Sequence, residues 1–361
     1  MEQEQKMQNI QIASSMGYVD LLIKSGEQFL GALRECKDCG VASSLNTLQA
    51  HAKFTCFEMM CVVVCALAWT GLRTATTKWI FQPFSKWCQL QPKEAEKVPE
   101  SAWKFLFYCA SWSYCSYLLF FTKHNFFHDP ASTFHGWTSG ADIPTEIALL
   151  YLVQGSFYAH STYATLYMDA WRKDSVVMIV HHVVTFTLII FSYAFRYHNI
   201  GILVLFHHDI NDILLEFSKL NVYFKTRGGT YHSVNGIITD IGSVLFSVSW
   251  FWFRLYWFPM KVLYVTCCSS LVSNPNIPFY FFFNLLLFAL TLMNIYWFLY
   301  IVMFVVKVIT GQVKEVNDVR EYDISENQKV KVSDDTKTLR HKNTVNNKQH
   351  IVNGFVKKKR A

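Results

Sequence analysis

Residues 181–219 read HHVVTFTLIIFSYAFRYHNIGILVLFHHDINDILLEFSK. Histidines and carboxylates lie well inside two apolar segments, each close to the roughly 20 residues that a helix needs to cross a bilayer. A charged group at the middle of a bilayer costs about 2.5 to 3.5 kcal/mol on insertion scales, so such groups persist mainly where they face a cavity or a partner. This stretch therefore predicts two adjacent membrane helices that line a polar cavity.

The composition of the whole chain favours a membrane protein. Of its 361 residues, 52% are hydrophobic and only 16% are charged, whereas soluble proteins carry about a quarter charged residues. This composition argues against a disordered chain, a disulfide scaffold and an ordinary cytosolic enzyme. We predict an all-α polytopic membrane protein with about seven transmembrane helices, near residues 54–72, 103–122, 146–167, 175–195, 200–220, 234–258 and 279–307.

The distribution of Lys and Arg predicts the topology. Basic residues concentrate in the odd-numbered loops, as Arg73, Lys78 and Lys86 do in the first, so we expect those loops and the C-terminus in the cytosol. With seven spans, the N-terminus then faces the lumen. The chain divides into an N-terminal lumenal segment (1–53), a first helix with its cytosolic loop (54–97), a membrane domain (98–310) and a disordered cytosolic tail (311–361).

The tail carries most of the net charge of +7, because residues 311–361 hold 12 Lys or Arg and 7 Asp or Glu. Lys358 and Lys359 stand fourth and third from the end, as in the dilysine signal that returns membrane proteins to the endoplasmic reticulum. The alternative is an ordinary basic, solvated chain end. We expect a protein of the endoplasmic reticulum membrane with no nucleic-acid partner.

Helical spacing gathers the polar residues of the membrane segments on shared faces. Asp209, Asp212 and Glu216 lie three and four residues apart, so one face of a helix carries all three carboxylates. His181 and His182 lie one turn or more inside the start of the preceding apolar segment, and antiparallel packing would bring the two sets together. The further residues of this expected polar network are His160, Asp169, Ser192, Tyr193 and His208.

Three interpretations of the cluster compete. Each polar group could simply satisfy another in a structural network. A metal site is chemically allowed, because imidazole and carboxylate suit iron or zinc, but the His-x-x-His-His boxes of membrane desaturases are missing, so we expect no metal. The favoured interpretation is acid–base or nucleophilic catalysis in a lipid-accessible cavity, since a carboxylate beside an imidazole orients it and makes it more basic.

The same residues match a known signature. In the order of the chain its positions are His181, His182, Thr185, Ser192, Tyr193, Gly201, Leu203, Val204, His208, Asp209, Asp212, Leu215, Glu216 and Lys219. This stretch resembles the Lag motif of ceramide synthases, within the TLC family, and the resemblance extends over roughly residues 98–323. It implies a TLC-type helical bundle that encloses a polar active-site cavity.

The resemblance also implies the reaction and its participants. Ceramide synthases transfer a fatty acyl group from acyl-CoA to sphinganine or sphingosine, so acyl-CoA is a substrate and no cofactor is expected. His181 or His182 would be the general base or a transient acyl carrier, with Asp209 and Asp212 orienting it and holding the ammonium ion of the base. Membrane lipids, and a homodimer or heterodimer with other members, are the further expected partners. A non-enzymatic TLC protein that senses lipid or assists translocation is the alternative.

The loop after the first span is too short for the homeobox-like segment that most animal members carry. In this respect the chain resembles members associated with stearoyl-CoA, whose acyl-chain length is influenced by a loop near residues 264–276 in this chain. Arg196, Asn199, His207 and Asn211 depart from the common motif, and no role follows for His207. A disulfide among Cys36, Cys39, Cys267 and Cys268 is an open alternative to free thiols.

Overall fold

The computed structural model describes residues 17–36 and 39–311, and these residues are predominantly helical. The expected disordered tail, with Lys358 and Lys359, lies outside the described residues. The N-terminal part comprises α2 (Tyr18–Arg34), α3 (Val41–His51), α4 (Cys56–Thr76), η1 (Thr77–Phe81), α5 (Gln82–Trp87), α6 (Pro92–Phe120) and η2 (Pro130–Phe134). There follow α7 (Thr145–Tyr167), α8 (Ser175–Ala194), α9 (His198–Phe224), β1 (Thr226–Arg227), β2 (Thr230–Tyr231), α10 (Ser233–Ser249), η3 (Trp250–Trp257), η4 (Pro259–Leu263), η5 (Val265–Ser269), α11 (Ser270–Ser273) and α12 (Tyr280–Ile309).

Each of the seven predicted spans corresponds to a helix, and within the described residues four are long and apolar enough to cross a membrane. These four are Cys56–Trp87, Ser175–Ala194, Ser233–Ser273 and Tyr280–Ile309. The other three predicted spans correspond to α6, α7 and α9, which carry more polar residues. Their crossing of the membrane stays a prediction.

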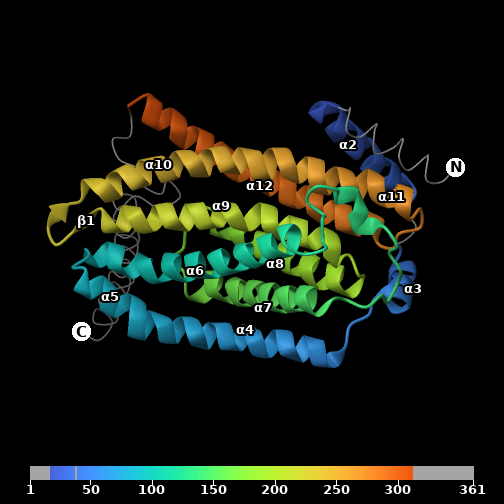
Figure 1. Cartoon of the computed structure of the whole chain (residues 1–361), viewed down its shortest axis with the longest axis horizontal. Coiled ribbons are helices and arrows are strands. Elements are labelled where there is room, and N and C mark those ends of the chain that lie inside the picture. The colour runs from blue at the N-terminus through green and yellow to red at the C-terminus, as the bar shows by residue number, and fades with distance from the viewer. Residues whose placement is uncertain (1–16, 37–38, 312–361) are drawn as a thin grey trace, which may run out of the picture. The chain divides into compact units, whose positions relative to one another are not determined.

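The helices run alongside one another, and α9 lies between α6 and α10 (Figure 1). The closest packing of α8 is against α7, which in turn packs on α4, whereas α8 and α9 share a smaller contact. A turn at Arg196, whose φ is 64°, reverses the chain between α8 and α9. The helices α8 and α9 therefore form the expected antiparallel pair, but α8 packs mainly on α7 and α9 packs mainly on α6 and α10.

The predicted loop near residues 264–276 is mostly helical, which corrects the sequence-based boundary at residue 258. Helical turns continue from Ser233 to Ser273, and most of those after Ser249 are π-helical. Pro259 lacks a backbone N–H and would interrupt an α-helix, but the wider turns accommodate it. Cys267 and Cys268 consequently lie buried in this helix as free thiols, while Cys36 and Cys39 form a disulfide.

The apolar core lies between α6, α7, α8, α9 and α12. Its fully buried side chains include Leu118, Ile147, Phe195, Ile202 and Leu290. The segment Cys56–Trp87, which includes α4, is different. Only 11% of its most apolar stretch is buried, as expected for a helix that faces lipid on most sides. The polar residues of the candidate site thus belong to the inner helices.

Candidate active site

Asp209 is fully buried on α9 and faces α6 and α7. Its Oδ2 atom accepts hydrogen bonds from Ser111 Oγ on α6, at 2.7 Å, and from Gln154 Nε2 on α7, at 2.8 Å. Gln154 also donates to Ser111, so the three side chains form a closed triangle. The Oδ1 atom of Asp209 has no hydrogen-bond partner within the described part of the chain. One carboxylate oxygen is therefore fixed by two donors, and the other is buried without a donor.

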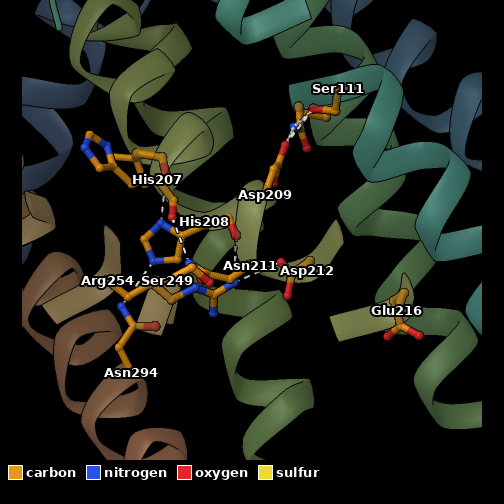
Figure 2. A network of polar contacts seen from close by, with 12 residues as sticks. Ser111, His207, His208, Asp209, Asn211, Asp212, Glu216, Ser249, Arg254 and Asn294 are labelled. Atoms are coloured by element: carbon orange, nitrogen blue, oxygen red, sulfur yellow. Dashed lines mark hydrogen bonds and ion pairs between the residues drawn. The ribbon is translucent and has the colours of Figure 1, made fainter. Parts of the chain in front are cut away.

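Asp212, one turn further along α9, is paired with Arg254 of η3. The Nη2 atom of Arg254 lies 3.0 Å from Asp212 Oδ2 and donates to the backbone carbonyl of His208 at 2.8 Å (Figure 2). The guanidinium also lies 4.0 Å from the centre of the Trp250 ring, a favourable cation–π position. Sequence reasoning gave Arg254 no role in the site, although an arginine inside an apolar segment signals a need for a counter-charge.

His208 is held by hydrogen bonds at both ring nitrogens. Nδ1 lies 2.8 Å from the carbonyl oxygen of Val204, and Nε2 lies 3.2 Å from Nδ2 of Asn294 on α12. A carbonyl oxygen only accepts and an amide nitrogen only donates, so the proton belongs on Nδ1 and the imidazole is neutral. Because protein groups engage both nitrogens, His208 supports the site rather than offering a free base.

His181 and His182 of α8 differ from His208, because each has a ring nitrogen without a hydrogen-bond partner in the described structure. Both are buried on α8, and the Nδ1 atom of each ring has no hydrogen-bond partner in the described structure. Their ring centres lie 5.7 Å apart, Tyr158 of α7 is in contact with both, and Trp297 of α12 packs against His181 edge to face. Aromatic side chains therefore surround these rings and leave both Nδ1 atoms without a hydrogen-bond partner.

We expected Asp209 and Asp212 to orient one of these imidazoles, and the structure does not show that pairing. Asp209 bonds Ser111 and Gln154, and Asp212 bonds Arg254. The reason lies in helix packing: α9 turns its carboxylates toward α6, α7 and η3, whereas α8 packs chiefly on α7. The donors Ser111, Gln154 and Arg254 belong to other segments, and no spacing within 181–219 could reveal them.

Three predicted supporting residues form separate contacts rather than one network. Asp169 pairs with Arg73 of α4 and with Lys104 of α6 at 2.7 Å, and both ion pairs are largely buried. His160 Nδ1 lies 2.9 Å from Thr70 Oγ1. Glu216 pairs with Lys219 at 2.9 Å, and Figure 2 shows it apart from the group around Asp212.

Ser192 and Tyr193 lie at the far end of α8. Ten residues separate Ser192 from His182, which is about 15 Å along a helix. Ser192 donates to the Tyr151 hydroxyl at 3.1 Å, and Tyr193 donates to Glu58 Oε1 at 2.7 Å. They are therefore not part of the hydrogen-bonded network around Asp209 and Asp212. His207 is also separate, because its ring is surrounded by Phe127, Phe253 and Trp257.

An apolar cavity of about 60 Å³ runs along α8 and α9 away from the two histidines. Thr185, which follows His181 by one helical turn, lines its near end, and Ile277 and Pro278 line it further along the bundle. Among the residues that the structure describes, no three His, Cys, Asp or Glu side chains are grouped so as to hold a metal ion. The described residues thus include two imidazoles and one carboxylate with unpartnered buried atoms, and an apolar cavity beside Thr185.

Comparison with known proteins identifies the family. Residues 97–303 match the TLC domain, so the chain is a TLC-domain membrane protein. Human ceramide synthase 1 is 57% identical over 343 residues, covering 95% of each chain, and mouse ceramide synthase 1 is 55% identical over 324 residues, covering 90% of this chain and 93% of its own. Ceramide synthase LOH2 of Arabidopsis thaliana is 31% identical over 234 residues, or 62% of this chain and 73% of its own. The chain belongs to the ceramide synthase family, in the branch of the two mammalian ceramide synthases 1.

Proposed function

We propose that the site around His181 and His182 transfers a fatty acyl group from acyl-CoA to the amine of a sphingoid base. As a ceramide synthase, the chain is a multi-pass membrane protein and an acyl-CoA-dependent sphingosine N-acyltransferase. The observation that carries the assignment of the site is the pair of buried imidazoles whose Nδ1 atoms are unpartnered, one helical turn from an apolar cavity. Sphinganine gives dihydroceramide, and sphingosine gives ceramide.

The reaction needs only a general base or a nucleophile, and an imidazole can serve as either. The thioester is already activated, whereas the sphingoid amine arrives as an ammonium ion and must lose a proton before it can attack the carbonyl carbon. In direct transfer, His181 or His182 takes that proton, the new C–N bond forms, and the C–S bond breaks to release CoA as its thiol. In the two-step route, one imidazole nitrogen first displaces CoA and carries the acyl group, which the amine then removes.

The structure supports different roles for the two carboxylates. Asp209 has one buried oxygen that accepts no hydrogen bond, so we assign it the role of holding the ammonium ion. The charge of Asp212 is already balanced by Arg254, so its role is to keep the arginine and the carbonyl of His208 in place. This division replaces the expectation that both aspartates orient a catalytic histidine and hold the ammonium ion.

We propose that the acyl chain enters the apolar cavity, which at about 60 Å³ is smaller than a stearoyl chain and must widen to hold one. Thr266, Ser270 and Ile277 line it, and all three belong to or adjoin the stretch 264–276 that the family resemblance connects with acyl length. We propose stearoyl as the preferred group on that resemblance. Exchange of residues 264–276 for those of an enzyme with a longer-chain product tests the assignment, because the product profile should shift to longer chains and an unchanged profile would argue against it.

We also propose the arrangement expected from the charges: seven spans, odd loops and C-terminus in the cytosol, N-terminus in the lumen, and residence in the endoplasmic reticulum membrane. Lys358 and Lys359 would act as the retrieval signal. A homodimer or a heterodimer with other ceramide synthases belongs to the same proposal. Cysteine-accessibility labelling of the first and second loops tests the topology, since only the first should react from the cytosolic side.

The function itself is tested with purified protein, sphinganine and stearoyl-CoA. The proposal predicts N-stearoyl-sphinganine and free CoA in equal amounts, with and without a chelator. A protein that binds both lipids without forming product would be a non-enzymatic TLC protein. Denaturing mass spectrometry after incubation with stearoyl-CoA alone separates the two routes: the two-step route predicts an acyl adduct on His181 or His182, and an unmodified active chain would exclude it.

A further inference from the structure

A second cavity lies between α4, α6 and α7, outside the Lag motif. Its volume is about 360 Å³, larger than the cavity along α8 and α9. Trp69 of α4, Phe107 and Ala110 of α6, and Val153 of α7 form its walls. We call it the α6–α7 groove. The helix α7 separates it from the proposed acyl cavity, since Tyr151 lines that cavity whereas Leu150 lines the groove.

The groove is apolar but leads to the polar centre of the site. Ser111 is among its lining residues and donates the 2.7 Å hydrogen bond to Asp209 Oδ2. Asp209 itself is fully buried, and its Oδ1 atom is unpartnered within the described chain. Only the side chain of Ser111 thus separates a molecule in the groove from Asp209, a buried carboxylate with one oxygen that accepts no hydrogen bond. Within the described structure, Asp209 is the one Lag-motif residue whose side chain is hydrogen-bonded to a residue that lines the groove.

The groove also opens toward the exterior of the bundle. Leu106 and Leu149 line it, and their side chains are 57% and 52% exposed. On a membrane protein such large exposed apolar side chains face lipid tails. A substrate dissolved in the bilayer therefore has a lateral route to Ser111 that does not pass through the acyl cavity.

We propose that the α6–α7 groove binds the alkyl chain of the sphingoid base and presents its ammonium group to Asp209, with Ser111 as a positioning residue. The proposal rests on the proposed function and names the route of one of its two substrates. The acyl chain then occupies the cavity on the other side of α7. The two chains then lie on opposite sides of α7, so neither substrate has to leave before the other binds.

Charge complementarity selects this occupant over the others at hand. The sphingoid base has a single chain and a cationic head, which suits an apolar groove that ends near a buried carboxylate. A phospholipid would bring its phosphate toward Asp209, where like charges repel at low dielectric. Acyl-CoA would have to place its phosphates near the same apolar walls, where burial of charge without a partner is costly.

The test uses the full-length protein in nanodiscs and variants that fill each cavity. Ala110→Phe and Val153→Phe narrow the groove, Leu188→Phe narrows the acyl cavity, and Leu292→Phe is a matched control at a side chain that is 67% exposed on α12. The parent must first form product with sphinganine and stearoyl-CoA, which tests the proposed function separately. Steady-state kinetics then give KM for each substrate.

The groove variants should raise KM for sphinganine about ten-fold, with KM for stearoyl-CoA and the acyl-length profile unchanged. A base with a much shorter tail should remove the difference between these variants and the parent, which shows that they are folded. Leu188→Phe should shift the acyl-length profile and leave KM for sphinganine unchanged, and Leu292→Phe should change neither. An active groove variant with the parent's KM for sphinganine would overturn the proposal and assign the groove to a bilayer lipid.

Photo-crosslinking gives a second, independent measurement. A sphingoid base with a photoreactive group in its tail should label residues 103–114 or 149–153, and excess sphinganine should prevent the labelling. Labelling confined to the acyl cavity, in residues 185–205, would overturn the proposal even if the kinetic effects were present.

Discussion

Arg254 and Asp212 form an ion pair of 3.0 Å across the boundary between η3 and α9. The side chain of Arg254 is 3% exposed and that of Asp212 is 21% exposed, so the charges are largely removed from solvent. The same guanidinium fixes the carbonyl of His208, whose ring is in turn held by Asn294 of α12. One pair therefore connects α9, η3 and α12 beside the site.

This pair makes a prediction about stability. Arg254→Met leaves Asp212 without its counter-charge and should destabilise the protein by about 2 to 3 kcal/mol, less than the 3 to 5 kcal/mol typical of a fully buried pair because Asp212 retains some exposure. Adding Asp212→Asn removes the orphaned charge and should restore part of the loss. Thermal unfolding in detergent measures both. Equal midpoints for the single and double variants would mean that the two residues are not coupled.

Asp209 should act on the amine rather than on the acyl donor. Asp209→Asn keeps an oxygen that can accept from Ser111 and Gln154 but removes the negative charge that holds the ammonium ion. We expect kcat/KM for sphinganine to fall about 100-fold, as when a preorganised electrostatic contact is lost. KM for stearoyl-CoA should stay unchanged, and acylation of the chain should persist where the two-step route operates.

The matched control for Asp209→Asn is Asp240→Asn, because Asp240 is exposed on α10. It should keep the parent's kinetics with both substrates. If Asp209→Asn changed KM for stearoyl-CoA and left sphinganine unaffected, Asp209 would belong to the acyl-CoA site and the division of roles between the carboxylates would be wrong.

Tyr193 should matter for stability and not for chemistry. Its hydroxyl donates to Glu58, which caps the start of α4 together with Thr55, so the contact joins α8 to α4 at the end of the bundle. Tyr193→Phe should lower stability by about 1 kcal/mol through the lost hydrogen bond. Both KM values and kcat should stay at the parent level. A large loss of kcat in a folded variant would instead assign Tyr193 a role in the active site.

Much of the helical architecture follows from local sequence. Long apolar runs locate every predicted span within a helix, and buried His and Asp residues mark the site, because polar groups in such runs need a cavity or a partner. The predicted end of the sixth span at residue 258 is wrong, because the helix continues to Ser273 through turns that Pro259 does not interrupt.

The partners of the site residues depend on long-range packing. Ser111, Gln154 and Asn294 are polar residues of largely apolar segments, and each could have bonded any neighbouring helix. Only the packing of α9 against α6 and η3 decides that Asp209 meets Ser111 and that Asp212 meets Arg254. A helical stripe shows which side chains share a face, but it does not show which helix lies opposite.

The most direct test of the active site is the rate of N-stearoyl-sphinganine formation by purified His181→Ala and His182→Ala, measured beside Tyr193→Phe. Thermal unfolding first establishes that each variant is folded. At least one histidine variant should lose about 100-fold or more in kcat, as expected when an acid–base or nucleophilic group is removed, while Tyr193→Phe keeps the parent's rate. Folded His181→Ala and His182→Ala variants that both stay within a few-fold of the parent would contradict the assignment of the reaction to these two imidazoles.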